Sequence, residues 1–390
     1  MREGWTYKKL GEVCESDLGK TLNSSKDTGE MRPYLCAINI LWDKIDFTTL
    51  KQTRFEKSEL ERYTVRKGDL LICEGGEIGR AAIWDKDYSI QYQNALHRVR
   101  FTDSVAPRFC LYFFMHLKKS GILDGRYGKG VTIKHLVKSS LMSIPIPVAP
   151  IETQLSIVAE LDKINELISL KKAQLSDLDS LAQSIFYDMF GDPIENEKGW
   201  EVKKLEDVCE TITDGDHMPP PKSENGIPFI TISDINKETR EIDFNNTFYV
   251  PQDYYDGLKE ERKAQVNDLL YTVTGSYGIP VVVKSSMPFC FQRHIALIRP
   301  IQEKLLTIFL CWWVLCPSVK GEADRVATGI AQKTVGLNSI RQFSIILPPL
   351  PLQQEFAKRI ELIEQQKAQI SSTIKDLETL LASRMQYWFD

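Results

Sequence analysis

The chain repeats its own sequence once, and this duplication limits the folds that it can adopt. A motif at residues 4–10, Gly-Trp-Thr-Tyr-Lys-Lys-Leu, returns at residues 199–205 as Gly-Trp-Glu-Val-Lys-Lys-Leu. The segment 93–100 returns in the same way at residues 292–299. Matches that keep their order over most of a chain are typical of a tandem duplication. We therefore expect two copies of one structural unit.

Each copy ends in a long stretch that has an apolar residue every three or four positions. Such a seam is typical of a helix that packs along a second helix. The first helix, from residue 157 to 189, would be about 50 Å long. The seam positions are Ile157, Leu161, Ile164, Ile168, Leu175, Leu178, Ala182, Ile185 and Met189 in the first copy, and Phe356, Ile360, Ile363, Ile370, Ile374, Leu377, Leu381 and Trp388 in the second. We expect the two helices to form an antiparallel coiled coil with pseudo-two-fold symmetry.

The segments before these helices have a mixed pattern. Short β-rich runs such as 34–40 and 229–232 predict strands, and the apolar runs 108–117 and 305–316 predict buried helices. Proline-rich hinges separate each body from its helix, and we align Pro147 and Pro150 with Pro348 and Pro351. The predicted fold class is α+β, with domains at 1–149 and 191–348 and spacer helices at 150–190 and 349–390.

Composition excludes several classes of protein. Eight cysteines without a Cys-x-x-Cys pair and five histidines indicate neither a zinc site nor a disulfide framework, and a reducing cytoplasm is expected. No apolar run is long enough to span a membrane. Residues 1–150 hold 24 basic and 18 acidic side chains, whereas residues 191–349 hold 17 basic and 22 acidic ones. If the chain binds nucleic acid, a partner must supply much of the charge.

Motifs for catalysis are missing from the sequence. Residues 19–21, Gly-Lys-Thr, resemble the end of a phosphate-binding loop, but the position of its first glycine is Cys14. The Asp/Asn-Pro-Pro-aromatic motif of amino methyltransferases is also absent. We therefore expect no enzymatic activity in this chain alone.

The order of domain, helix, domain and helix resembles the specificity subunits of type I restriction-modification enzymes. The resemblance covers the whole chain and includes the two Gly-Trp motifs, Pro-Leu-Gln-Gln-Glu at 351–355, Asp-Gly-Asp-His at 214–217 and Phe-Gln-Arg-His at 291–294. It implies a non-catalytic subunit with two target recognition domains. Each domain would read one half of a bipartite site in double-stranded DNA, and the helical rod would set the gap.

The resemblance also implies partners. Two modification subunits would bind S-adenosylmethionine and methylate adenine, and restriction subunits, where a system has them, would use ATP and Mg. No cofactor is expected on this chain. Two alternatives stay open: a partner in which methyltransferase and endonuclease are fused, and a structural scaffold that does not read sequence. Acidic residues on the outer face of the first helix are either solvated or dock modification subunits: Glu152, Glu160, Asp162, Glu166, Asp177 and Asp179.

Polar and basic side chains on loops are the residue types that read base edges and phosphates. Lys171 and Lys367, in the seams, either fix the helix register or extend out of it. The candidate DNA contacts are Lys20, Asn23, Ser24, Lys26, Gln91, Gln93, Asn94, Lys129, Lys134 and His135 in the first domain, and His217, Lys222, Tyr277, Gln292, Arg293, His294, Gln332 and Lys333 in the second.

Overall fold

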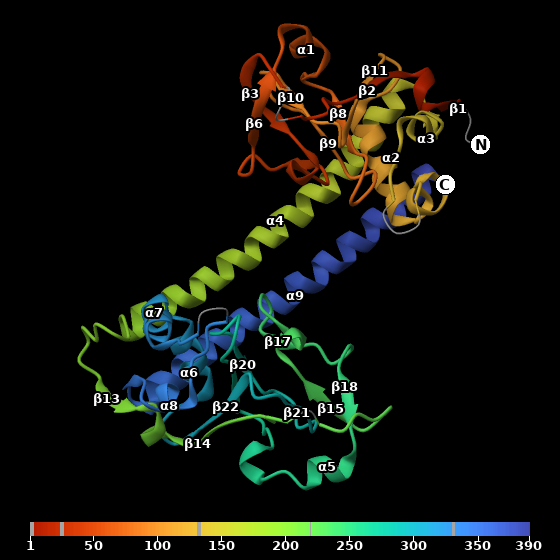
Figure 1. Cartoon of the computed structure of the whole chain (residues 1–390). Helices are drawn as coiled ribbons and strands as arrows, with labels where there is room; N and C mark the ends of the chain where they lie inside the picture. The colour runs from red at the N-terminus through yellow and green to blue at the C-terminus, as the bar shows by residue number, and fades with distance from the viewer. Residues whose placement is uncertain (1–3, 24–26, 131–133, 219, 330–331) are drawn as a thin grey trace. The chain divides into compact units, whose positions relative to one another are not determined.

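A computed structural model describes residues 4–23, 27–130, 134–218, 220–329 and 332–390, which form two compact units (Figure 1). Unit 1 contains the chain up to residue 172 together with residues 372–390, and unit 2 contains residues 173–371. Two long helices, α4 (Ile151–Phe190) and α9 (Leu350–Phe389), each contribute to both units. Each unit therefore combines one mixed α and β body with part of both helices.

The bodies are built from short strands and helices. Unit 1 contains β1 (Thr6–Lys9), β2 (Cys14–Leu18), β3 (Glu30–Leu35), β4 (Ile40–Leu41), β5 (Lys44–Ile45), β6 (Lys51–Phe55), α1 (Lys57–Arg62), β7 (Thr64–Val65), β8 (Leu70–Cys73), β9 (Ala81–Ile83), β10 (Ile90–Tyr92), β11 (Leu96–Phe101), α2 (Pro107–Lys119), α3 (Lys138–Met142) and β12 (Pro145–Val148). Unit 2 contains β13 (Glu201–Lys204), β14 (Cys209–Asp214), β15 (Ile227–Ile230), β16 (Ile235–Asn236), β17 (Glu241–Ile242), β18 (Phe248–Val250), α5 (Gln252–Asp256), β19 (Leu269–Thr272), β20 (Pro280–Val282), β21 (Cys290–Phe291), β22 (Ile295–Pro300), α6 (Thr307–Leu315), α7 (Pro317–Val326), α8 (Leu337–Arg341) and β23 (Ser344–Leu347).

The main sheets of the two units have the same topology, whereas the second sheet has four strands in unit 1 (β6-β3-β10-β7) and three in unit 2 (β18-β15-β21). The main sheet has the strand order β2-β11-β8-β9 in unit 1 and β14-β22-β19-β20 in unit 2. A second sheet contains one parallel pair in each unit, β3 with β10 and β15 with β21. Small hairpins, β4-β5 and β16-β17, and the pairs β1-β12 and β13-β23 complete the match. The duplication and the α+β class predicted from the sequence are confirmed.

Two sequence predictions need correction. The expected strand 34–40 ends at Leu35, because Asn39 accepts a hydrogen bond from the Cys36 backbone (2.9 Å) and turns the chain. The proline alignment was shifted by two residues. Thr6 pairs with Val148 and Glu201 pairs with Leu347, so Pro150 corresponds to Pro349 and not to Pro351.

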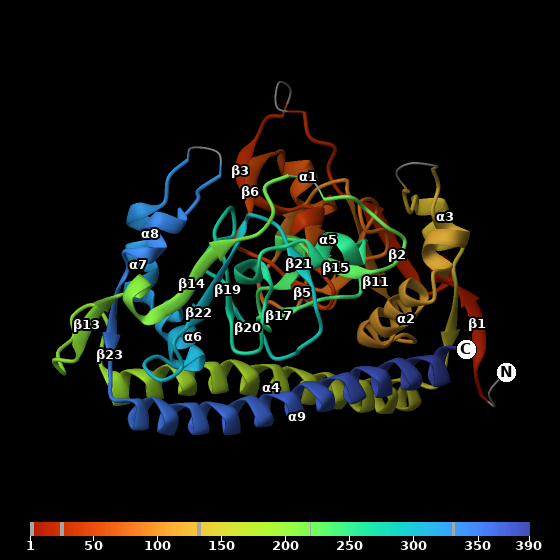
Figure 2. The ribbon, with the colours of Figure 1, turned by 90° about the horizontal axis from the view of Figure 1, so that it is seen from below.

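Within each unit the segments of α4 and α9 run side by side in opposite directions (Figure 2). In unit 1, Lys172 lies 2.9 Å from Glu378, and Glu160 pairs with Arg384. In unit 2, Lys367 lies 2.9 Å from Asp179. Residues near the start of α4 therefore pair with residues near the end of α9, which confirms the predicted antiparallel packing.

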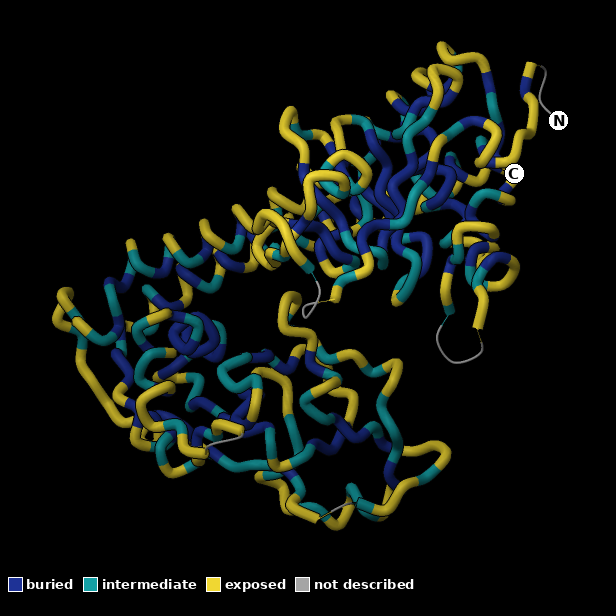
Figure 3. The backbone as a smooth tube through the Cα atoms, turned by 45° about the horizontal axis from the view of Figure 1, so that its top comes forward, coloured by how far each residue is buried: buried dark blue, intermediate teal, exposed yellow. Residues whose placement is uncertain are grey.

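Residues on one side of each long helix are buried, as the seams predicted (Figure 3). Near the helix ends, however, the buried positions are Phe186 and Phe190, whereas the predicted Ile185 and Met189 are half-buried. Phe389 replaces Trp388 in the same way. A straight helix drifts by about 20° per heptad against a strict seven-residue repeat, which moves the seam by one residue.

A buried glutamine fixes the start of each long helix to its body. The side-chain oxygen of Gln154 accepts a hydrogen bond from the Ala106 backbone (2.9 Å), and its nitrogen donates to Ser104 and Ala149 carbonyls (both 2.8 Å). Gln353 repeats this arrangement in unit 2 with the backbone groups of Leu306, Lys304 and Pro348. Both side chains are fully buried and fully bonded, so the two helix starts are held in the same way.

Candidate nucleic-acid interface

Four loop segments of unit 2 are joined by backbone hydrogen bonds at one end of the main sheet. The backbone N–H of Arg293 donates to the Asp216 carbonyl (3.0 Å), and that of Val273 donates to the His294 carbonyl (2.9 Å). The backbone N–H of Val335 donates to the Val273 carbonyl (2.9 Å). We call the segments 214–217, 273–275, 292–294 and 333–336 the unit 2 loop cluster. Since the loops share main-chain bonds, their side chains project from a rigid support.

Unit 1 contains the same backbone framework. The backbone N–H of Asn94 donates to the Lys20 carbonyl (3.0 Å), and that of Glu74 donates to the Ala95 carbonyl (3.0 Å). The backbone N–H of Leu136 donates to the Glu74 carbonyl (2.7 Å). We call the segments 17–20, 74–76, 93–95 and 134–136 the unit 1 loop cluster. By these hydrogen bonds, Lys20 is equivalent in position to Asp216, Asn94 to Arg293, and Ala95 to His294.

A glycine in each cluster permits the close approach of two backbone segments. A Cβ atom at Gly215 would lie 1.9 Å from the Phe291 carbonyl oxygen, and one at Gly19 would lie 2.4 Å from the Gln93 carbonyl carbon. Any side chain larger than hydrogen would push the loops apart. These glycines were not among the residues predicted from the sequence, although each follows the end of its strand at an equivalent place.

The unit 2 cluster surrounds a cavity of about 300 Å³. Its lining residues are Asp214, His217, Val273, Thr274, Arg293, His294, Thr334, Val335, Gly336 and Leu337. Arg293 is exposed, and His217 lies 2.9 Å from Asp214. Burial, with the charges of Arg293 and His217, lowers the pKa of His294 below its ordinary value. A neutral imidazole beside a guanidinium offers both donors and an acceptor, the groups that read base edges.

The structure therefore brings together His217, Gln292, Arg293 and His294 among the predicted contacts of unit 2. Lys333 adjoins them, because its carbonyl accepts the Gly275 nitrogen (3.0 Å). The remaining three lie outside the cavity lining. Lys222 is exposed over the Phe248 ring at 4.9 Å, Tyr277 donates to Asp324 on α7, and Gln332 is exposed. Thr274 and Thr334, with hydroxyls 3.3 Å apart, line the cavity and were missed because threonine pairs carry no motif.

Two predicted contacts of unit 1 are turned inward. Lys20 is only 4% exposed, and its ammonium lies 2.7 Å from Glu59 and 2.8 Å from the Arg54 carbonyl. Gln91 is buried and donates to the Thr64 hydroxyl (3.3 Å). Such groups are used within the fold, so this geometry does not favour either as a DNA contact.

The other predicted contacts of unit 1 reach solvent to different degrees. Gln93 and Asn94 are half-buried in the cluster, and Asn94 donates to the Thr21 hydroxyl (3.3 Å). Lys129 and His135 are exposed and pair through their backbones, while Lys134 donates to the Asp124 carbonyl (2.6 Å). Asn23 is exposed, and Ser24 and Lys26 lie outside the described residues.

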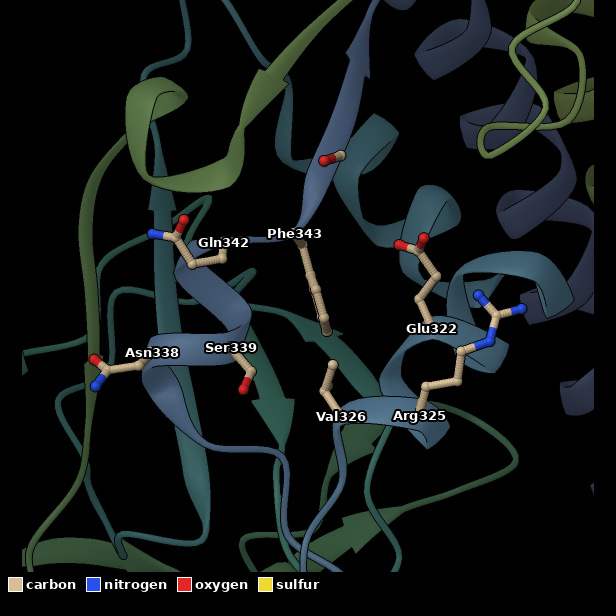
Figure 4. A pocket seen from close by; sticks show the side chains of 8 residues that line it. Glu322, Arg325, Val326, Asn338, Ser339, Gln342 and Phe343 are labelled. Carbon is tan, nitrogen blue, oxygen red and sulfur yellow. The ribbon is translucent and has the colours of Figure 1, made fainter.

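A separate open groove of about 470 Å³ lies between α7 and α8 of unit 2 (Figure 4). Glu322, Arg325 and Val326 on α7 face Ser339 on α8 and Phe343 beyond it, and none of these residues belongs to the loop cluster.

In the part of the chain that the structure describes, no group of three or more His, Cys, Asp and Glu side chains could hold a metal ion. Among the same residues, none of the helices combines the length and apolar character that crossing a membrane requires.

Comparison with known proteins gives consistent matches. The family described as type I restriction modification DNA specificity domain matches residues 2–179 and again residues 197–379. The type I restriction enzyme MjaIX specificity subunit of Methanocaldococcus jannaschii is 24% identical over 394 residues, which cover 92% of this chain and 86% of that protein. The EcoBI specificity subunit of Escherichia coli is 24% identical over 329 residues, 77% of this chain and 68% of that protein. A chain solved in work on assembly and conformational transition of the type I R-M system is 18% identical and has a TM-score of 0.63, covering 99% of this chain and 97% of that chain.

Proposed function

This chain belongs to the type I restriction modification DNA specificity family, with two copies of the specificity domain, and from this premise we propose that it reads a bipartite DNA site. Each loop cluster would contact one half-site. The observation that carries this proposal is the repetition of one backbone framework with different side chains at equivalent positions. A rigid support with variable polar groups is what sequence-specific contact requires.

We propose a non-catalytic role, in which chemistry belongs to partner subunits. Two modification subunits would bring S-adenosylmethionine and methylate adenine, and restriction subunits, where present, would bring ATP hydrolysis and Mg. Such partners would also supply the positive charge that a chain of net charge −4 lacks for tight phosphate binding. In this role the chain would act in the cytoplasm.

The gap between half-sites would depend on the paired helices α4 and α9. Helix length is fixed at about 1.5 Å per residue, so the pair can act as a spacer whose length the sequence determines. Insertion of one heptad at facing positions of both helices is expected to change the gap and leave both half-site sequences as they were.

Methylome sequencing tests the proposal. Cells carrying this chain with its modification subunit are expected to show adenine methylation at a motif of two parts separated by unspecified bases. A single continuous motif would contradict the spacer role. Methylation without any motif would favour a scaffold that does not read sequence, and the domain content of the partner would distinguish separate from fused methyltransferase and endonuclease.

A further inference from the structure

The tip of the small hairpin in each unit carries a residue with an unusual backbone conformation. Asp43, at the end of the β4-β5 turn, has φ of 56°, and Arg240, before β17, has φ of 55°. Side chains with a Cβ atom rarely adopt this left-handed region, and arginine does so less readily than aspartate or asparagine. Such outliers persist where surrounding contacts hold them, which directs attention to what the two tips touch.

In unit 2 the hairpin tip contacts both long helices. The Arg240 guanidinium lies 3.2 Å from Asp179 on α4 and 3.9 Å from Glu364 on α9. It also lies 5.1 Å from the centre of the Trp312 ring on α6. Lys367 on α9 shares Asp179 at 2.9 Å. The Arg240 side chain is 18% exposed and that of Asp179 is 45% exposed, so the pair is partly buried on the arginine side.

In unit 1 the tip reaches its helix with the charges reversed. Both oxygens of Asp43 accept from the Arg108 guanidinium, at 2.8 and 2.9 Å. The same guanidinium donates to Asp162 on α4 through Nε (2.6 Å). Asp43 therefore connects its hairpin to α4 through Arg108, whereas Arg240 contacts the long helices directly.

The hairpins also contact the turn that leads to each loop cluster. Lys237 donates to the Ser276 hydroxyl (2.7 Å) in unit 2, and Trp42 donates to Glu77 (2.8 Å) in unit 1. Glu77 and Ser276 occupy equivalent places after β8 and β19. The Gly275 nitrogen then donates to the Lys333 carbonyl in the cluster (3.0 Å). A continuous set of contacts therefore runs from helix through hairpin to loop cluster.

We propose that the hairpins at 40–45 and 235–242 fix the position of each loop cluster on its helices, and that Asp43 and Arg240 are positioning residues that enforce the gap length. This inference rests on the proposed function. A gap longer by one base pair moves a half-site by about 3.4 Å and turns it by about 35°. If the unit 2 body shifted on its helices to reach a displaced half-site, Arg240 would move away from Asp179. The ion pair therefore opposes binding to sites with a longer or shorter gap.

The test measures methylation on a library of sites that carry both half-motifs separated by the wild-type gap or by gaps one base pair shorter or longer. Arg240→Met keeps an unbranched apolar stem and removes the charge. It is expected to raise methylation at the neighbouring gaps, relative to the wild-type gap, about fivefold, which corresponds to about 1 kcal/mol. Arg240→Lys keeps the charge and is expected to keep most of the discrimination. The bases of both half-motifs are expected to stay the same.

One further variant extends the test to unit 1, and another serves as a control. Asp43→Asn removes the charge in unit 1 while asparagine tolerates the left-handed backbone, so it tests the second tip without altering the turn. Lys284 lines the same cavity of about 190 Å³ as Arg240, but its ammonium faces Glu241 at 3.9 Å. Lys284→Met removes this neighbouring cation and is expected to change nothing.

The outcomes separate this inference from the proposed function. If the wild-type protein gives no two-part motif, the proposed function fails. If the wild-type motif is bipartite but Arg240→Met and Asp43→Asn lower methylation equally at every gap, the tips serve stability alone and the inference is overturned. Unchanged gap preference in both variants overturns it as well.

Discussion

The two loop clusters share a backbone framework and carry opposite charges at one equivalent position. Lys20 in unit 1 is neutralised by Glu59 at 2.7 Å and Asp27 at 3.2 Å. Its counterpart Asp216 faces Arg262 at 3.7 Å. A cation and an anion thus occupy equivalent places, each balanced by groups from its own body. The framework is therefore independent of the charge that it carries, which leaves the side chains around it free to differ between half-sites.

Disturbing the backbone that the two clusters share is expected to have the largest effect. Gly215→Ala would place a Cβ atom 1.9 Å from a carbonyl oxygen, and we expect a loss of roughly 3 kcal/mol in the free energy of unfolding of unit 2. Gly19→Ala, at 2.4 Å, is expected to do the same in unit 1 to a smaller extent. Urea unfolding with hydrogen exchange assigns the loss to each unit.

Gly321→Ala is the matched control, because an added Cβ there meets no atom within 4 Å and the residue lies inside helix α7. We expect it to be neutral or to stabilise by up to about 1 kcal/mol. If Gly215→Ala stayed within about 0.5 kcal/mol of wild type, the backbone framework would not depend on this close approach.

A second difference between the two units is sensitive to pH. His97 is buried in unit 1 and its Nε2 bonds the Leu136 carbonyl at 2.7 Å, whereas the equivalent place in unit 2 is Ala296. Burial lowers the pKa of His97 to about 4. The unfolded chain binds a proton at higher pH than the folded one does, so stability is complete above about pH 6.5 and falls as the pH drops toward 4.

We expect His97 to remove about 2 kcal/mol of stability between pH 7 and pH 5. His97→Gln can keep a donor to Leu136 but has no proton to gain, so this part of the pH dependence is expected to vanish. Urea unfolding of both proteins at the two pH values measures it. Equal pH dependence in wild type and variant would show that His97 is not its source.

The sequence predicted the architecture well because duplication and helical periodicity are properties of the chain itself. It predicted the candidate site less well. Gln93 and Asn94 sit in the loop cluster as expected, but Lys20 is enclosed by Glu59, a residue 39 positions away. Whether a lysine faces solvent or a carboxylate depends on how loops pack, and no local pattern encodes that. The drift of the helical seam toward Phe186 and Phe190 has a similar origin, since it accumulates over the whole helix.

Replacing Lys20 tests whether its enclosed charge is structural. Lys20→Met leaves Glu59 and Asp27 without their cation, and we expect unit 1 to lose about 1 to 2 kcal/mol in the free energy of unfolding. The methylated motif is expected to keep both half-sites. A changed base in one half-site would show instead that Lys20 leaves its carboxylates to contact DNA.

The smallest effects on stability, and the most selective effects on function, are expected at the positions where the clusters differ in side chains that reach solvent. Arg293→Ala in unit 2 and Asn94→Ala in unit 1 remove polar groups at equivalent backbone positions, and neither change is expected to alter stability by more than about 0.5 kcal/mol. Each good base contact contributes about 1 to 3 kcal/mol of discrimination. Arg293→Ala is therefore expected to relax one half-motif and Asn94→Ala the other, as read by methylome sequencing of each variant. If one substitution relaxed the sequence specificity of both half-motifs, or if both substitutions relaxed the same half-motif, the two clusters would not read separate half-sites. A uniform loss of methylation with unchanged motifs would assign these residues to phosphate contacts. For Arg293→Ala, which removes a cation, the DNA affinity would then fall less steeply with added salt than in wild type.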